Sequence, residues 1–184
     1  MIWIDLDNTL IYTIDSFDRL AEQLKLPSAA RSEPNLEIVS VGDAKEQACV
    51  RPFAQEFLAG LRALQPVCML TTATRAYAQA MNAHFALGFE PGAIVAREDW
   101  MEFPLARMKV YRPNKLGVDA AGILIDDDDE TIHCRMKLVY LGCRVLVTVP
   151  VFRGSDFDPF SETWVELLST VAEKLARKST RKNR

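Results

Sequence analysis

Two pairs of acidic residues stand directly after short apolar runs in this sequence. Asp5 and Asp7 follow the apolar start of the chain, and Asp126 and Asp127 follow Ile123 to Ile125. Each run is typical of a buried strand, and in open α/β sheets ligands bind outside the carboxyl ends of the strands. If the two strands are neighbours, their carboxylates form a cation site whose hard oxygen ligands favour magnesium. The alternative for the first pair is a polar strand end followed by a turn.

Two further groups are candidates for the same site. Thr71 supplies a hydroxyl where another apolar run ends, and Lys109 supplies a cation shortly before the second acidic pair. Each has a plainer interpretation, since Thr71 could cap the following helix and Lys109 could be a solvated surface lysine. The order carboxylate pair, hydroxyl, lysine, carboxylate pair is more specific than any one of its members.

Apolar runs alternate with amphipathic segments along the chain, which predicts an α/β fold with a central, mainly parallel sheet. Strands are expected at 1–6, 67–70, 93–96, 122–125 and 144–149. Pro52 suits the first turn of a helix. Three helical faces are expected from apolar spacings of three and four: Phe53, Phe57, Leu61 and Leu64; Tyr77, Met81, His84 and Phe85; and, within 163–174, Trp164, Leu167, Leu168 and Val171.

Residues 1–176 are expected to form one domain with a small insertion at about 12–49. The insertion is predicted to hold a short helix over 14–24, a loop over 27–35, and a hairpin of 36–41 and 47–50 around Gly42-Asp43. Residues 177–184 are basic and are expected to be a disordered tail. The alternative for this tail is a weak electrostatic tether for nucleic acid or for an acidic phosphoprotein.

The composition is that of a globular protein. The 184 residues are 49% hydrophobic and 26% charged, and the net charge of −3 combines an acidic body with the basic tail. No apolar run approaches the roughly 20 residues of a membrane helix, and the start lacks the apolar core of a signal peptide. The cysteines form no C-x-x-C pair and are expected to be reduced. We therefore expect a cytoplasmic protein, or one of another reducing compartment, without a membrane partner.

Several segments are similar to the motifs of one known family. They are Asp5-Leu6-Asp7-Asn8-Thr9; Val50-Arg51-Pro52 with Glu56-Phe57-Leu58; Leu70-Thr71-Thr72-Ala73-Thr74 with Tyr77-Ala78; Arg97-Glu98 before Lys109; Leu116-Gly117 with Asp119; Asp126-Asp127; and Phe152-Arg153-Gly154 through Asp158. From Ile2 to about Ala176 the chain resembles the haloacid dehalogenase superfamily of aspartate-nucleophile phosphatases. Within it, the chain resembles the branch of the RNA polymerase II C-terminal-domain phosphatases. It departs from that branch at Phe53, where glycine is usual, and at Val118, where arginine is usual.

The resemblance implies a role for each matching polar residue. Asp5 would be the nucleophile that forms an aspartyl-phosphate, and Asp7 would be the general acid and later the base. Thr9 would orient Asp7, Thr71 would hydrogen-bond the phosphoryl oxygens, and the ammonium of Lys109 would offset their charge.

The resemblance also implies a Mg²⁺ site. Its ligands would be Asp5, Asp126 and the backbone carbonyl of Asp7, with Asp127 at the metal or just behind it. Independently of the resemblance, the run Asp128 to Glu130 is expected to be a solvated acidic loop, as runs of charge usually are.

The segments between the motifs are too short for the large cap domain of many superfamily members. An open site favours a bulky substrate, so we expect a phosphoserine or phosphothreonine segment of a protein. The alternatives are a phosphatase of nucleotides or other small metabolites, and a non-catalytic binding protein with this fold. A receiver domain of two-component signalling fits less well, because its first strand does not carry the D-x-D-x-T pattern.

Overall fold

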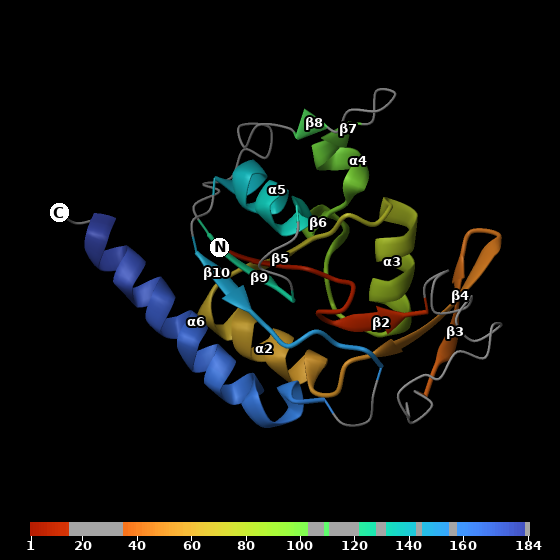
Figure 1. Cartoon of the computed structure of the whole chain (residues 1–184), viewed down its shortest axis with the longest axis horizontal. Coiled ribbons are helices and arrows are strands. Elements are labelled where there is room, and N and C mark those ends of the chain that lie inside the picture. The colour runs from red at the N-terminus through yellow and green to blue at the C-terminus, as the bar shows by residue number, and fades with distance from the viewer. Residues whose placement is uncertain are drawn as a thin grey trace.

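The computed structural model describes residues 1–14, 35–102, 109–110, 122–127, 132–142, 145–154 and 158–182. Its centre is a five-stranded sheet in the order β10-β9-β1-β5-β6, in which all neighbours are parallel (Figure 1). The strands are β1 (Ile2–Ile4), β5 (Val67–Leu70), β6 (Ile94–Val95), β9 (Ile123–Asp126) and β10 (Leu146–Thr148). The predicted α/β class is confirmed, and each predicted strand range overlaps an observed strand, although β9 continues one residue beyond its predicted range to Asp126.

Helices cover both faces of this sheet. Because side chains alternate along each strand, neighbouring residues of β1 point to different faces. Ile2 and Ile4 point to one core, which they share with residues of α2 (Ala54–Leu64), α3 (Arg75–His84) and α6 (Phe160–Lys182). Trp3 points to a second core, shared with α4 (Arg97–Trp100) and α5 (Ile132–Leu141). Figure 1 shows α2 and α6 side by side, with α5 across the sheet from them.

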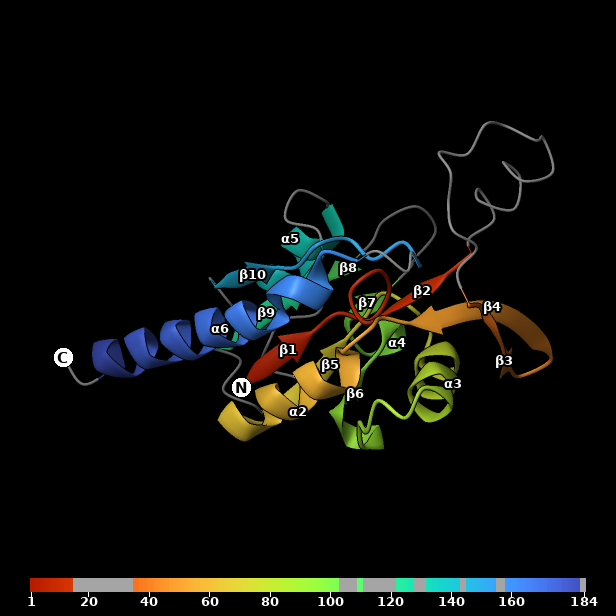
Figure 2. The same ribbon diagram turned by 90° about the horizontal axis from the view of Figure 1, so that it is seen from below.

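The segment after β1 contributes a small antiparallel sheet in the order β2-β4-β3. It consists of β2 (Ile11–Thr13), β3 (Glu37–Val41) and β4 (Ala44–Val50), and it extends away from the central sheet next to α3 (Figure 2). Gly42 has a φ of 59° in the turn between β3 and β4. The predicted hairpin is therefore confirmed, whereas the loop predicted at 27–35 and the helix predicted at 14–24 lie almost wholly outside the described residues.

The remaining short elements lie between β5 and β9. They are the 3-10 helix η1 (Pro91–Ala93) and the two antiparallel strands β7 (Met101–Glu102) and β8 (Lys109–Val110). No helix in the described ranges is both long and apolar enough to cross a membrane.

Two helices differ from prediction at their ends. Phe53 precedes α2 with a φ of 61°, so its ring leaves the buried face and stacks on Trp164 of α6 at 6.1 Å between centroids. Leu64 is also exposed, so the predicted face is buried only at Phe57 and Leu61.

Helix α6 begins at Phe160 and continues through residues 177–182, which we expected to be disordered. An ion pair between Glu173 and Arg177, one turn apart, and the cations of the last turns favour helix there.

Candidate active site

Asp5 and Asp126 lie side by side at the carboxyl edge of the central sheet. Ile4 of β1 pairs with Ile125 of β9, and the Asp5 amide donates a hydrogen bond to the Ile125 carbonyl at 3.0 Å. Asp5 follows β1 directly, whereas Asp126 is the last residue of β9. Both side chains are buried. The pairing of the two strands therefore brings together the two carboxylates on which the predicted cation site depends.

Asp127 completes a group of three carboxylates with a geometry suited to a metal ion. One oxygen each from Asp5, Asp126 and Asp127 lies within 4.8 Å of the others. Thr9 fixes the outermost member by donating its hydroxyl hydrogen to Asp127 Oδ1 at 3.0 Å. Such a set of crowded oxygen anions needs positive charge, and it fits a hard divalent cation such as Mg²⁺.

Lys137 of α5 contacts two of these carboxylates. Its Nζ lies 2.6 Å from Asp5 Oδ1 and 2.8 Å from Asp126 Oδ2, and the side chain is buried. Our sequence predictions missed this residue. Cys134 and Leu141 are buried on the same helix, so a lysine three and four positions from them stands on an apolar stripe. A cation on such a stripe is the sequence feature by which Lys137 could have been found.

Burial shifts the protonation of the site carboxyl groups. Removal from water raises the pKa of Asp5 to about 8. The attraction of Lys137 lowers this pKa, whereas the repulsion of Asp126 raises it further. Burial also raises the pKa of Asp7 and of Asp127. These carboxyl groups therefore hold their protons more readily than exposed ones do, and a bound divalent cation would favour their ionised forms.

Asp7 is held by Tyr77 of α3. The Tyr77 hydroxyl donates to Asp7 Oδ1 at 2.6 Å, and Thr13 Oγ1 lies 2.5 Å from the Tyr77 oxygen. Because Tyr77 has one hydroxyl hydrogen, Thr13 is the donor in the second bond. We expected Thr9 to orient Asp7, but its single hydroxyl hydrogen goes to Asp127. The sequence patterns place Tyr77 in a motif and on a helix face, but they do not predict its contact with Asp7.

Thr71 follows β5, which neighbours β1, and its side chain is fully buried. Its hydroxyl oxygen accepts a hydrogen bond from the Ala73 amide at 3.0 Å, which leaves the hydroxyl hydrogen as a donor. The cap of α3 is Thr74, whose side chain accepts from the Tyr77 amide. The alternative that Thr71 caps this helix is therefore wrong.

The family model of NLI interacting factor-like phosphatases matches residues 1–137. The chain belongs to this family. The predicted membership in the haloacid dehalogenase superfamily, in its C-terminal-domain phosphatase branch, is thereby confirmed. No curated protein sequence matches the chain significantly.

Two solved structures share the fold of this chain. One is the fission yeast RNA polymerase II CTD phosphatase Fcp1, in a variant bound to beryllium fluoride, at 16% identity and a TM-score of 0.50. The other is Fcp1 described as an essential RNA polymerase II CTD phosphatase, at 17% identity and a TM-score of 0.51. The matches cover 98% of this chain but 54% and 52% of the Fcp1 chains. The chain thus spans about half the length of these two structures.

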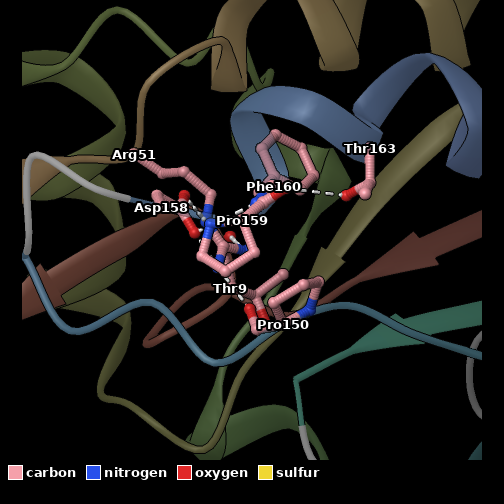
Figure 3. Close-up of polar contacts among 7 residues, drawn as sticks. All are labelled: Thr9, Arg51, Pro150, Asp158, Pro159, Phe160 and Thr163. Carbon is pink, nitrogen blue, oxygen red and sulfur yellow. Dashed lines mark hydrogen bonds and ion pairs between the residues drawn. The ribbon is translucent and has the colours of Figure 1, made fainter.

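In this family member, Arg51 ties the loop that carries Asp7 and Thr9 to two distant segments (Figure 3). Its Nη1 donates to the Thr9 carbonyl at 2.8 Å, and its Nε pairs with Asp158 Oδ2 at 2.8 Å. Nη2 donates to the Pro150 carbonyl. The guanidinium also lies 4.6 Å from the ring centre of Phe160, at the start of α6. This network fixes the backbone immediately after the first acidic pair.

Lys109 stands in β8, where it is opposite Glu102 of β7 in the two-stranded sheet. Its side chain lies outside the part of the structure that is described. Its predicted role as the motif lysine of the family therefore stays a prediction.

Proposed function

We propose that this protein is a Mg²⁺-dependent phosphomonoesterase that works through a phosphorylated Asp5. The observation that supports it most strongly is the buried group of Asp5, Asp126 and Asp127 at the carboxyl edge of the sheet, with Asp7 beside it on the same loop. A nucleophile, a metal-binding carboxylate set and a separate proton donor are the parts that such a reaction requires.

The metal would be held by Asp5 and Asp126, with the Asp7 backbone carbonyl as a third ligand and Asp127 at or behind the ion. When bound, Mg²⁺ supplies positive charge that offsets the repulsion between the phosphate dianion and these carboxylates. The three-carboxylate geometry supports this assignment. Thr71, with its hydroxyl hydrogen available, would donate to a phosphoryl oxygen.

In the first step, a carboxylate oxygen of Asp5 attacks the phosphorus atom. The bond between phosphorus and the leaving oxygen breaks, and Asp7 gives its proton to that oxygen, so the product is an alcohol. The raised pKa of Asp7 supports this role, because burial keeps a proton on the group that must donate it.

In the second step, the Asp7 carboxylate takes a proton from a water molecule as the water oxygen attacks the same phosphorus. The bond between phosphorus and Asp5 breaks. Inorganic phosphate leaves, Asp5 is restored as a carboxylate, and Asp7 again carries its proton.

The substrate we propose is a phosphoserine or phosphothreonine segment of a protein. The family description and the two Fcp1 structures, which are CTD phosphatases, support this class. The described residues between β1 and β5 form a three-stranded sheet and one helix, which also supports a site open to a polypeptide.

Hydrolysis of p-nitrophenyl phosphate with Mg²⁺ tests the reaction. We expect turnover by the wild type, loss with a chelator, and no turnover by Asp5→Asn. Asp43→Asn, at an exposed turn, is the matched control and should keep full activity. A fully active Asp5→Asn protein would overturn the proposal. Turnover on phosphoserine peptides, compared with a panel of nucleotide monophosphates, tests the substrate class.

A further inference from the structure

Among the side chains that the structure describes, Lys137 is the lysine that contacts Asp5, the proposed nucleophile, and it comes from the helix after the second acidic pair. We propose that Lys137 supplies the ammonium that binds the phosphoryl group as it is transferred to Asp5, the role that the family resemblance gives to Lys109. This inference rests on the proposed function, since it names a further catalytic residue of the same reaction.

The position of the Lys137 ammonium is the first support. Nζ bridges Asp5 Oδ1 at 2.6 Å and Asp126 Oδ2 at 2.8 Å. An ammonium has three N–H donors, and these two contacts engage two of them. A phosphoryl group attacked by Asp5 must come within bonding distance of an Asp5 oxygen. Its oxygens would then lie within reach of the remaining donor.

The charge of Lys137 is the second support. A lysine this deeply buried is stable as a cation only when it is paired, and here two carboxylates pair with it. The positive charge is therefore a fixed part of the site. Once Asp5 is phosphorylated, the same charge would face the phosphoryl oxygens that replace the free carboxylate.

The anchoring of α5 is the third support. Cys134, Tyr140 and Leu141 of this helix are buried in the core beneath β1 and β9, beside Trp3 and Leu124. Lys137 thus extends from a rigid element, as a preorganised electrostatic group requires.

A competing interpretation gives Lys137 a structural role as the counter-ion of Asp5 and Asp126. Both roles predict a destabilised Lys137→Met protein. They differ in phosphate binding, because only a phosphoryl-binding lysine contributes to the affinity for inorganic phosphate, the reaction product. Competitive inhibition by inorganic phosphate is therefore a readout that a purely structural role would not move.

The experiment compares Lys137→Met, Lys137→Arg and Lys109→Met, with Lys45→Met at an exposed position of β4 as the control. In the presence of saturating Mg²⁺, we expect Lys137→Met to lower kcat on the order of 100-fold. We also expect its inhibition constant for inorganic phosphate to rise at least about tenfold, whereas Lys45→Met should match the wild type. Lys137→Arg should retain phosphate inhibition and fold normally, but lose about tenfold in kcat because its planar fork displaces the charge.

The assignment is overturned if Lys109→Met loses activity on that scale while Lys137→Met stays active. It is also overturned if Lys137→Met loses activity with an unchanged inhibition constant for phosphate, since that result identifies a structural counter-ion. If Lys137→Met does not fold, the kcat of Lys137→Arg tests the assignment. A Lys137→Arg kcat equal to that of the wild type contradicts it. An inactive wild type, or an active Asp5→Asn protein, would instead reject the proposed function itself.

Discussion

Arg51 and Asp158 form a buried ion pair that joins the segment between β4 and α2 to the start of α6. Arg51 Nε lies 2.8 Å from Asp158 Oδ2, and the two side chains are 0% and 2% exposed. Asp158 also accepts a hydrogen bond from the Phe160 amide, so the acceptor caps the helix as well. Because Arg51 holds the Thr9 carbonyl, the position of the D-x-D-x-T loop depends on this pair.

We predict that Arg51→Met lowers the free energy of unfolding by about 3–5 kcal/mol, because it leaves the Asp158 carboxylate buried without its partner. Urea denaturation measures the change. Arg135→Met, at an exposed position of α5, should stay within about 0.5 kcal/mol of the wild type. Replacing both partners, as Arg51→Met with Asp158→Leu, should cost less than the two single changes added together. A loss at Arg51 no larger than that at Arg135 would contradict this account of the pair.

Tyr77→Phe should reduce kcat about tenfold with little change in KM, because it removes the hydroxyl that orients Asp7. The Tyr77 hydrogen bond favours the charged form of Asp7, so its loss should raise the pKa of Asp7. Because Asp7 must be protonated for the first step, the alkaline limb of the pH–kcat profile should move to higher pH. Thr13→Val should shift the limb in the same direction by less. An unmoved limb in Tyr77→Phe argues against Asp7 as the proton donor.

The stability of the metal-free protein should fall with rising pH between about 4 and 8. Burial raises the pKa of Asp5 from 3.8 to about 8 in the folded state. Its stabilising contribution is therefore complete below pH 3.8 and is lost as the pH rises through about 8. Asp5→Asn cannot ionise at this position, so its free energy of unfolding should fall between pH 4 and pH 8 by at least about 1 kcal/mol less than that of the wild type. Urea midpoints across the pH range, with a chelator present, test this expectation, and an equal fall in the two proteins would refute it.

Mg²⁺ should raise the unfolding midpoint of the wild type at pH 8, because it binds the folded carboxylate group and not the unfolded chain. Asp126→Asn should abolish this rise, and Asp127→Asn should increase the Mg²⁺ concentration for half-maximal activity about 10- to 100-fold. Asp43→Asn should respond to Mg²⁺ as the wild type does. A normal Mg²⁺ response in Asp126→Asn would place the metal elsewhere.

Local patterns predicted the parts of the site that the sheet alone positions. Apolar runs located the five strands, and acidic residues at the ends of two runs identified Asp5 and Asp126. The partners of these groups were beyond such patterns because they depend on how helices pack. Lys137 reaches Asp5 only because α5 docks on the sheet, and Tyr77 reaches Asp7 from α3.

The end of α6 and the start of α2 differ from prediction for a related reason. Composition favoured a disordered basic tail, whereas helix propensity and the Glu173–Arg177 pair continue the helix beyond Ala176. Apolar periodicity placed Phe53 on a buried face, whereas its positive φ before the first turn directs it to Trp164. Neither a backbone conformation nor a side-chain partner on another helix can be predicted from spacing alone.

The most direct test of the central claim is to trap the phosphorylated enzyme. The wild type is mixed with substrate and Mg²⁺, quenched in acid, digested with pepsin at low pH, and analysed by mass spectrometry. The account predicts a phosphoryl group on Asp5 that is absent from Asp5→Asn and disappears as substrate is consumed. An enzyme that turns over substrate without a phosphoryl group on Asp5, or with one on another residue, would contradict it.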